Sequence, residues 1–328
     1  MTYKILVVDD EPNNLQLVKR TLHRYYTIIT ANNAQEAIEL LKQNDDISMI
    51  ISDHKMPGMS GVELLQHCFN HYPNIIRMLI TAYSEVPILV DAINTGKIHR
   101  YIKKPWTPEE LLLTVDKAFE ANKLSIENSK LIADFKDLFS GTISAITDAL
   151  DEKDKYTAGR SKRVCEYAIA IAREMNLTDI EMSKLEVASL LHDIGVIGVP
   201  EYILHKSDKL TDDEYMQIKK HVEYGLKILG SIKQLDSVVN IIKAHHERYD
   251  GTGYPYGLRG EEIPIGARII ALADTFDALI STRAYRNSHS VDEAVEIITA
   301  QAGKQLDYNV VQAFLRVVDN FEYNIEKE

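Results

Sequence analysis

The sequence is poor in cysteine, in long apolar runs and in positive charge, and each shortage excludes a class of protein. Only two of its 328 residues are cysteines, Cys68 and Cys165, so a disulfide framework does not hold this chain together. No apolar run reaches the length that spans a membrane, so we predict no transmembrane helix. The first ten residues read as a strand and lack the charged start and cleavage site of a signal peptide. We therefore expect a cytoplasmic protein.

Positive charge is outnumbered: 37 lysines and arginines stand against 49 aspartates and glutamates, for a net charge of −12. A DNA-binding protein normally carries a basic face, and no basic cluster or zinc-finger spacing occurs here. We expect neither DNA nor a membrane as a partner. Because the chain is acidic overall, an anionic substrate could bind only where metal ions and nearby arginines make the local electrostatic potential positive. The length leaves room for two domains, each with its own core.

The first 120 residues alternate between strand-like and helix-like segments. Short apolar runs predict strands at 4–8, 49–52, 76–81 and 101–103. Helical spacing occupies 14–22, 34–42, 86–94 and 108–122. About five such alternations predict a doubly wound α/β fold, with a five-stranded parallel sheet covered by helices on both faces.

Polar side chains lie at the carboxyl ends of these strands, which is the edge of a parallel sheet where functional residues are usually found. The residues are Asp9, Asp10, Asp53, Thr81 and Lys104. Converging carboxylates repel one another unless a cation binds, and an oxygen-rich site favours Mg²⁺. Ordinary solvated loop acids are the alternative, but five such residues at successive strand ends disfavour it.

Four motifs resemble those of response-regulator receiver domains, and the resemblance covers all of residues 1–120. They are VVDDE (7–11), SDHKMPGMSG (52–61), LITA (79–82) and KKPW (103–106). The resemblance implies that Asp53 accepts a phosphoryl group from a cognate histidine kinase and that Asp9, Asp10 and Asp53 hold Mg²⁺. It further implies that Thr81 and Lys104 engage the phosphoryl oxygens and that Tyr101 is the aromatic switch. Phosphate charge would then reorder a loop through new charge-assisted hydrogen bonds.

Residues 121–140 are predicted to form a connecting helix, with no breaker before Gly141 and no Gly/Ser/Pro-rich linker. Leu124, Leu131 and Leu138 recur every seven residues, which amounts to barely two heptads. Two interpretations stay open. The helix packs on its own domains, or it pairs with a second copy in a homodimer that transmits the state of the receiver.

Residues 141–328 are predicted to form an all-α domain. Helices are expected at 143–150, 161–175, 181–192, 212–229, 235–246, 267–279, 291–302 and 310–320. Six imidazoles and carboxylates stand in these apolar surroundings: His192, Asp193, His221, His245, His246 and Asp274. Buried His/Asp clusters are usually paired or hold a metal, and this donor set suits Fe, Mn, Zn, Co or Ni better than Ca²⁺. The six residues could hold two cations, with one carboxylate bridging them.

The HD pair at 192–193 and the run HHERYDGTGYP at 245–255 resemble the HD-GYP group of the HD phosphohydrolases, over nearly all of 141–328. The resemblance implies a site with two divalent ions, iron or manganese, that hydrolyses cyclic di-GMP to pGpG or GMP. His192 and Asp193 would be catalytic. One ion would lie on His192, Asp193 and Asp274, and the other on Asp193, His221, His245 and His246. The signature loop, through which other cyclic di-GMP signalling proteins would bind, is Gly253, Tyr254 and Pro255. Residues implied to bind substrate are Arg283, Tyr285 and Arg286.

Two departures from this group bear on activity. Arg160 stands where the group usually has a metal-ligating histidine, and arginine cannot ligate a metal. Val196 stands where a lysine usually follows His-Asp-Ile-Gly. Both favour a degenerate output domain that binds nucleotide or protein without turnover, whereas the six retained ligands favour an enzyme. We expect a response regulator whose phosphorylation at Asp53 controls cyclic di-GMP hydrolysis. A third interpretation keeps this chemistry with a different phosphorylated nucleotide.

Overall fold

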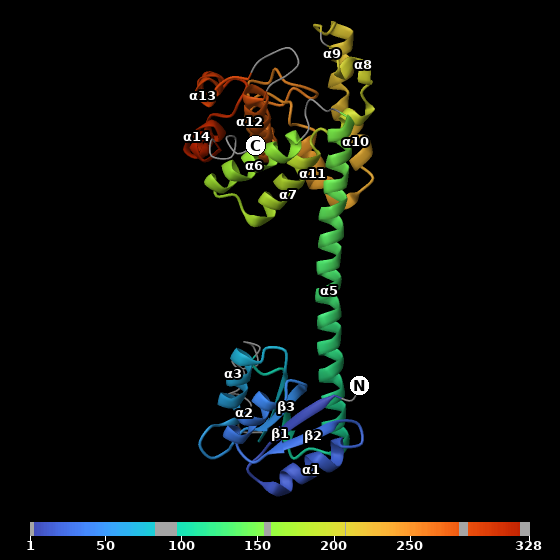
Figure 1. Cartoon of the computed structure of the whole chain (residues 1–328), viewed down its shortest axis with the longest axis vertical. Coiled ribbons are helices and arrows are strands. Elements are labelled where there is room, and N and C mark those ends of the chain that lie inside the picture. Colours follow the sequence, from blue (N-terminus) through green and yellow to red (C-terminus); the bar gives the residue numbers. More distant parts are fainter. Residues whose placement is uncertain (1–2, 83–96, 154–158, 207, 282–287, 322–328) are drawn as a thin grey trace. The chain divides into compact units, whose positions relative to one another are not determined.

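The structure is a computed structural model that describes residues 3–82, 97–153, 159–206, 208–281 and 288–321. The chain divides into two compact units, Met1–Asp134 and Phe135–Glu328 (Figure 1). The helix expected at 86–94 lies outside the described residues. None of the described helices combines the length and the apolar character needed to cross a membrane.

The first unit contains the predicted five-stranded parallel sheet. Its strands are β1 (Lys4–Val8), β2 (Thr27–Ala31), β3 (Ile47–Asp53), β4 (Ile76–Ala82) and β5 (Arg100–Lys104). Their order is β2-β1-β3-β4-β5, so the winding direction reverses between β1 and β3. Ligands of such sheets bind outside the carboxyl ends of the strands, at this reversal. The strand β2 was not predicted from the sequence, because an edge strand that is mostly part-exposed lacks the apolar run of a central strand.

Helices cover both faces of the sheet. The helices α2 (Ala34–Gln43) and α3 (Gly61–His71) pack on one face, and α1 (Pro12–Leu22) packs on the other with the first turns of α5 (Pro108–Lys153) (Figure 1). A capping box begins α3, in which the Ser60 hydroxyl and the Glu63 side chain satisfy backbone N–H groups reciprocally. The parallel sheet is therefore buried on both sides, as its continuous apolar strands require.

The helix α5 does not stop near Gly141, which corrects the separate helix expected at 143–150. One glycine costs a helix only about 1 kcal/mol relative to alanine. Buried residues on the following turns, Ile143 and Leu150, join the core of the second unit and hold the helix past that point. Glycine alone was therefore too weak a signal to end the helix.

The second unit is helical, as predicted. Its α-helices are α6 (Arg160–Glu174), α7 (Asp179–Leu191), α8 (Glu201–Leu204), α9 (Asp212–Lys219), α10 (His221–Leu229), α11 (Asp236–Ile242), α12 (Ile265–Ile280), α13 (Val291–Ala300) and α14 (Tyr308–Val317), and short 3₁₀ turns are η2 (Ile194–Gly198), η3 (Lys233–Leu235) and η4 (Gly260–Glu262). The helix expected over 212–229 is instead two helices, because the chain turns between α9 and α10 at Lys220, directly before His221.

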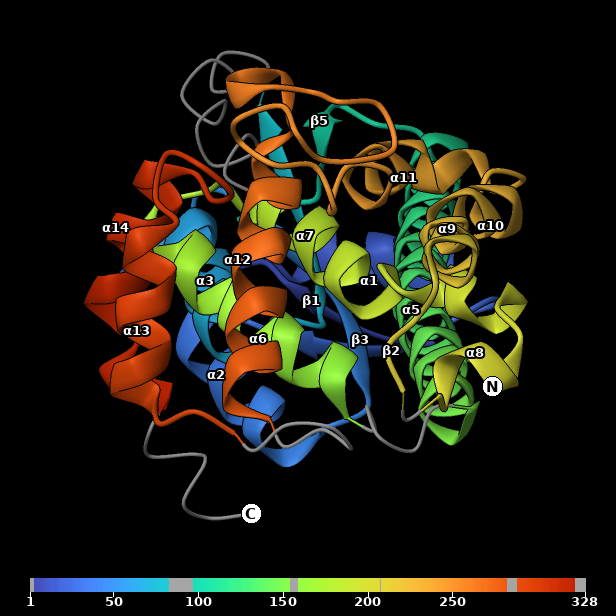
Figure 2. The ribbon, with the colours of Figure 1, turned by 90° about the horizontal axis from the view of Figure 1, so that it is seen from above.

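The core of this unit forms around α12. Figure 2 shows α12 beside α6, with α13 and α14 next to it. Phe276 of α12 is fully buried and meets Tyr167 of α6 and Phe314 of α14 edge-on, with ring centroids 5.1 and 5.0 Å apart. Edge-to-face contacts of this kind add stability beyond the burial of apolar area. The core thus fixes α6 against α12, the two helices that present Arg160 and Asp274.

Candidate metal centre and receiver site

Four elements of the helical unit deliver the six predicted ligands. His192 and Asp193 follow the last turn of α7, His221 begins α10, His245 and His246 follow α11, and Asp274 lies in α12. Gly195 lets these elements approach, since a Cβ there would lie 1.7 Å from the carbonyl oxygen of His221. The glycine of the His-Asp-Ile-Gly motif is therefore required by packing between η2 and α10.

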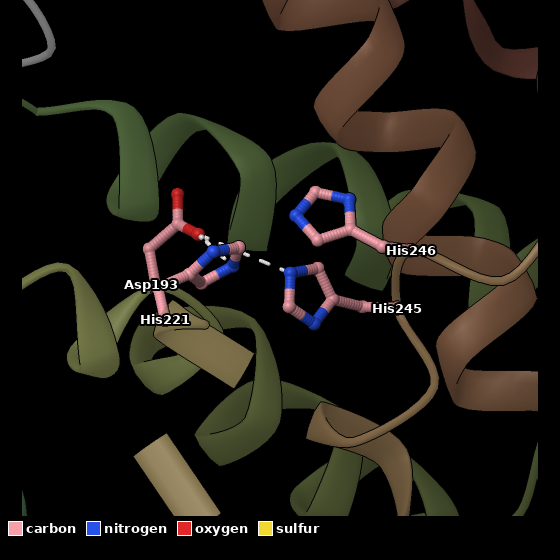
Figure 3. Close-up of side chains that lie close together, drawn as sticks. All are labelled: Asp193, His221, His245 and His246. Atoms are coloured by element: carbon pink, nitrogen blue, oxygen red, sulfur yellow. Dashed lines mark ion pairs between the residues drawn. The ribbon is translucent and has the colours of Figure 1, made fainter. Parts of the chain in front are cut away.

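The carboxylate of Asp193 points towards the rings of His221 and His245 (Figure 3). Its Oδ1 lies 3.5 Å from His221 Nε2 and 3.9 Å from His245 Nε2. Its Oδ2 lies 3.1 Å from His192 Nε2, which in turn lies 3.6 Å from Asp274 Oδ1. One carboxylate thus faces His221 and His245 with one oxygen and His192 with the other.

These atoms form two sets that could each hold a cation. The first contains Asp193, His221, His245 and His246, and the second contains His192, Asp193 and Asp274; within each set the ligand atoms lie within 4.8 Å of one another. All six residues expected from the sequence come together, with Asp193 shared. In the described part of the chain, these two are the sets of at least three His, Cys, Asp or Glu ligands with this spacing.

The histidines present their Nε2 atoms to the centre. The Nδ1–H groups of His192, His221 and His245 donate to the backbone carbonyls of Ser189, Ile218 and Ile242, at 2.8, 2.7 and 2.6 Å. The three Nε2 atoms are buried and lack a hydrogen-bond partner; His192 Nε2 is near Asp193 without the alignment of a hydrogen bond. A carbonyl on Nδ1 fixes ring orientation and leaves Nε2 for a metal. The donor set therefore fits a divalent transition metal.

The pKa values of the histidines differ across the cluster. Burial disfavours a charged His192, but Asp193 and Asp274 outweigh burial and raise its pKa to about 10. Burial, with His246 beside it, holds the pKa of His245 well below its ordinary value. Burial and His221 lower the pKa of His246 to about 4. His245 and His246 are accordingly neutral, the form that ligates metal.

Arg160, the first residue of α6, enters the second set of ligands. Its Nη2 lies 2.5 Å from Asp274 Oδ1 and its Nε lies 4.0 Å from Asp193 Oδ2. The side chain is only 15% exposed. Burial opposes its charge, but Asp274 and Asp193 raise the pKa of Arg160 above its ordinary value. A permanent positive charge therefore lies against the two carboxylates.

The signature loop closes over the first set. Tyr254 stacks on His246, with ring centroids 4.8 Å apart, and Lys219 Nζ lies 4.9 Å from the centre of the Tyr254 ring. Gly253 is required there, because a Cβ would lie 2.3 Å from the backbone nitrogen of Arg248. Pro255 follows on the exposed side of the loop. The loop thus buttresses one candidate ligand directly.

Glu247 holds this loop, and the sequence analysis missed it. Its buried carboxylate accepts backbone N–H groups of Tyr256, Gly257 and Leu258 at 2.7, 3.1 and 3.1 Å. The sequence does contain one indication of this role. Glu247 directly follows two histidines in apolar surroundings, and a carboxylate buried there needs hydrogen-bond partners. Three backbone donors provide them.

The residues expected to bind substrate, Arg283, Tyr285 and Arg286, lie outside the described residues. Val196 is half-buried in η2. A lysine does reach this segment, but from α5: Lys153 Nζ donates to the carbonyl of Val199 at 3.1 Å and to that of Ile197.

In the first unit, the predicted receiver residues lie at the carboxyl ends of β1, β3, β4 and β5. Asp9, Asp53 and Thr81 are buried, and Asp10 is exposed. Asp9 Oδ1 accepts N–H groups from the Glu11 backbone at 2.9 Å and the Asn14 side chain at 3.1 Å. Burial raises the pKa of Asp9 against these hydrogen bonds.

Lys104 supplies positive charge to this pocket. Its Nζ forms an ion pair with Asp53 Oδ1 and lies 3.8 Å from Asp9 Oδ2. The backbone N–H of Lys55 donates to the other Asp53 oxygen at 3.1 Å. Tyr101 of β5 is 37% exposed. The structure therefore joins Asp9, Asp53 and Lys104 directly and leaves the Tyr101 ring at the surface.

Comparison with known proteins finds two families in this chain. Residues 5–116 match the response regulator receiver domain, and residues 144–310 match the HD domain. A "Cyclic di-GMP phosphodiesterase" of Thermotoga maritima is 30% identical, over 95% of this chain and 90% of that protein. The "Cyclic di-GMP phosphodiesterase response regulator RpfG" of Xanthomonas campestris pv. campestris is 32% identical, over 95% and 87%. A "3'3'-cGAMP-specific phosphodiesterase 2" of Vibrio cholerae is 34% identical, over 60% and 38%.

Proposed function

The chain belongs to the HD-GYP response regulators, in which a receiver domain precedes an HD domain, and we propose that it is a metal-dependent phosphodiesterase that hydrolyses cyclic di-GMP. We assign residues 1–120 to the receiver, 121–140 to a connecting helix and 141–328 to the HD-GYP domain. The expected products are pGpG, GMP or both.

One observation carries the proposal: Asp193 divides its two oxygens between His221 and His245 on one side and His192 on the other. The orphaned Nε2 atoms around it are ligands without a partner. We assign iron or manganese to the set of His221, His245, His246 and Asp193, because nitrogen and carboxylate donors together suit these ions. The second set, with His192 and Asp274, is where the resemblance puts a second ion, and Arg160 lies against it.

A bound divalent ion supplies Lewis acidity for the hydrolysis of a phosphodiester. The chain's own residues orient the substrate and transfer protons. Asp193 Oδ2 and His192 Nε2 lie 3.1 Å apart, close enough to exchange a proton once the two groups align. The loop of Gly253, Tyr254 and Pro255 holds His246 and shields its face from water. Arg283, Tyr285 and Arg286 are proposed to bind the phosphates and bases of the substrate.

The receiver is proposed to control this site through phosphorylation of Asp53 by a cognate histidine kinase. Asp9, Asp10 and Asp53 would hold Mg²⁺, which neutralises the pocket for an incoming phosphoryl group. Lys104 already pairs with Asp53 and would form an ion pair with the new phosphoryl group. Thr81 would hydrogen-bond to the phosphoryl oxygens, and Tyr101 would be the switch residue.

We further propose a homodimer that pairs through α5. Leu124, Leu131 and Leu138 are 58%, 66% and 69% exposed, at heptad spacing along this helix. Exposed leucines at such spacing are typical of a helix that packs against a second copy. The exposed side of the signature loop, at Pro255, is available to other cyclic di-GMP signalling proteins.

A second candidate function is a degenerate output domain that binds the nucleotide, or a protein, without turnover. The ion pair between Arg160 and Asp274 favours it, because that pair occupies a predicted ligand. A third, hydrolysis of another cyclic dinucleotide, gains support from the Vibrio cholerae relative.

Turnover distinguishes these functions. The full chain, purified without oxygen and loaded with Mn²⁺, is incubated in parallel with cyclic di-GMP and 3'3'-cGAMP, and the products are separated by chromatography. We expect linear products from cyclic di-GMP, and none from His245→Ala. Cleavage of 3'3'-cGAMP alone would reassign the substrate, and cleavage of neither would favour the binding module.

A further inference from the structure

Arg160 approaches the same oxygens that a second metal ion would need. Asp274 Oδ1, which lies 3.6 Å from His192 Nε2, is 2.5 Å from Arg160 Nη2. Asp193 Oδ2, which lies 3.1 Å from His192 Nε2, is 4.0 Å from Arg160 Nε. The guanidinium therefore faces one oxygen of each carboxylate in the second set, Asp193 and Asp274.

We propose that the guanidinium of Arg160 takes the place of the second cation, so that the centre binds one divalent ion, on His221, His245, His246 and Asp193. The inference rests on the proposed function and narrows its metal content. Arg160 then supplies positive charge, and a donor for phosphate oxygens, from a fixed position beside the bound ion.

Space and distance support this assignment. Metal–ligand bonds to nitrogen and oxygen are about 2.0–2.2 Å long, so an ion on Asp274 Oδ1 would lie within about 5 Å of Arg160 Nη2. Two positive charges that close repel strongly in a buried site. The first set of ligands escapes this conflict, because Asp193 turns its other oxygen, Oδ1, towards His221 and His245.

Charge balance points the same way. With the imidazoles counted as neutral, Asp193 and Asp274 carry two negative charges. One divalent ion and one guanidinium exceed these by a single positive charge. A second divalent ion would raise that surplus to three. Uncompensated charge is costly in a largely buried site, so the arrangement with one ion is favoured.

The side chain of Arg160 is also held in place. One turn along α6, Arg163 pairs with Asp277 through Nε–Oδ1 at 2.6 Å and Nη2–Oδ2 at 3.2 Å. Asp277 lies on α12, three residues after Asp274, and is 1% exposed. Two Arg–Asp ion pairs, Arg160–Asp274 and Arg163–Asp277, therefore join α6 to α12 and hold Arg160 in position beside the ligands.

Metal content of the full chain tests the inference without reference to turnover. The protein is purified without oxygen, loaded with excess Mn²⁺, desalted and analysed by inductively coupled plasma mass spectrometry. We expect one ion per chain in the wild type and two in Arg160→His, in which an imidazole replaces the guanidinium. Arg163→His is the matched control, because it puts a histidine one turn away, beside Asp277, and should keep one ion.

A second pair of variants covers the case in which Arg160→His fails to fold. His192→Ala should keep its single ion, whereas His245→Ala should lose it. Two ions in the wild type, a single ion in folded Arg160→His, or equal loss in His192→Ala and His245→Ala would each overturn the inference. No ion in the wild type would overturn the proposed metal centre as well, so the two failures are distinguishable.

Discussion

Asp193 and His192 are neighbours in sequence, yet the carboxylate oxygen that faces His192 is not the one that faces the other histidines. Asp193 Oδ2 lies 3.1 Å from His192 Nε2, while Oδ1 lies 3.5 Å from His221 Nε2. Every role proposed for the centre depends on this division. Replacement of Asp193 should therefore damage metal binding and catalysis together.

We predict that Asp193→Asn lowers cyclic di-GMP turnover by more than about 100-fold, the upper range for loss of even an outer-shell partner. Its affinity for Mn²⁺ should fall as well, since an amide is a poorer ligand than a carboxylate. Asp148→Asn is the control, because it removes only an exposed ion pair with Lys162. Wild-type metal binding by Asp193→Asn, measured by calorimetric titration, would exclude Asp193 as a ligand.

The buried carboxylate of Glu247 makes a second prediction. Glu247→Gln replaces one acceptor oxygen with an amide NH₂ group, which would face either the N–H groups of Tyr256 and Gly257 or the N–H group of Leu258. A buried group left unsatisfied costs about 1–3 kcal/mol, so the free energy of unfolding should fall by that amount. Urea denaturation measures it, with the exposed Glu261→Gln as control. Equal stability of the two variants would contradict the role given to Glu247.

Phosphorylation supplies a third prediction. Asp53→Asn should abolish labelling by radioactive acetyl phosphate, because Asp53 is the proposed acceptor at the carboxyl end of β3. Asp45→Asn, on an exposed residue of the same unit, should label like the wild type. Persistent labelling of Asp53→Asn would remove Asp53 from its role.

The exposed leucines of α5 give a fourth prediction. Leu131→Glu puts a charge in the middle of the heptad positions and should convert the proposed dimer to a monomer in size-exclusion chromatography with light scattering. Lys130→Glu changes charge on the adjacent, exposed position and should leave the dimer intact. A wild-type chain that is monomeric at every concentration would contradict pairing through α5.

The sequence predicted the sheet and the ligand set well, because both leave strong local signals. The run at β1 was matched to the residue, since a buried parallel strand is apolar on both faces. The six metal-ligand candidates were found by residue type and motif, and the structure brings all six together. The resemblance implied the same division into two sets, but which oxygen of Asp193 faces which ring was not predictable, because it depends on the side-chain torsions.

Other features depend on tertiary contacts that no local pattern records. The break at Lys220 separates two helices whose combined sequence has helical spacing throughout. Arg160 was recognised as a departure that brings a positive charge, but its ion pair with Asp274 requires the packing of α6 on α12. Glu247 received no role from the sequence, because its partners are backbone N–H groups of a loop whose course no local pattern records.

The most direct test of the account is the dependence of hydrolysis on metal equivalents. The full chain is stripped with a chelator, dialysed and titrated with Mn²⁺ while cyclic di-GMP cleavage is followed by chromatography. The account predicts no cleavage by the stripped protein and a rise that levels off at one equivalent per chain. Cleavage without metal, or cleavage that begins only when a second equivalent is bound, would contradict it.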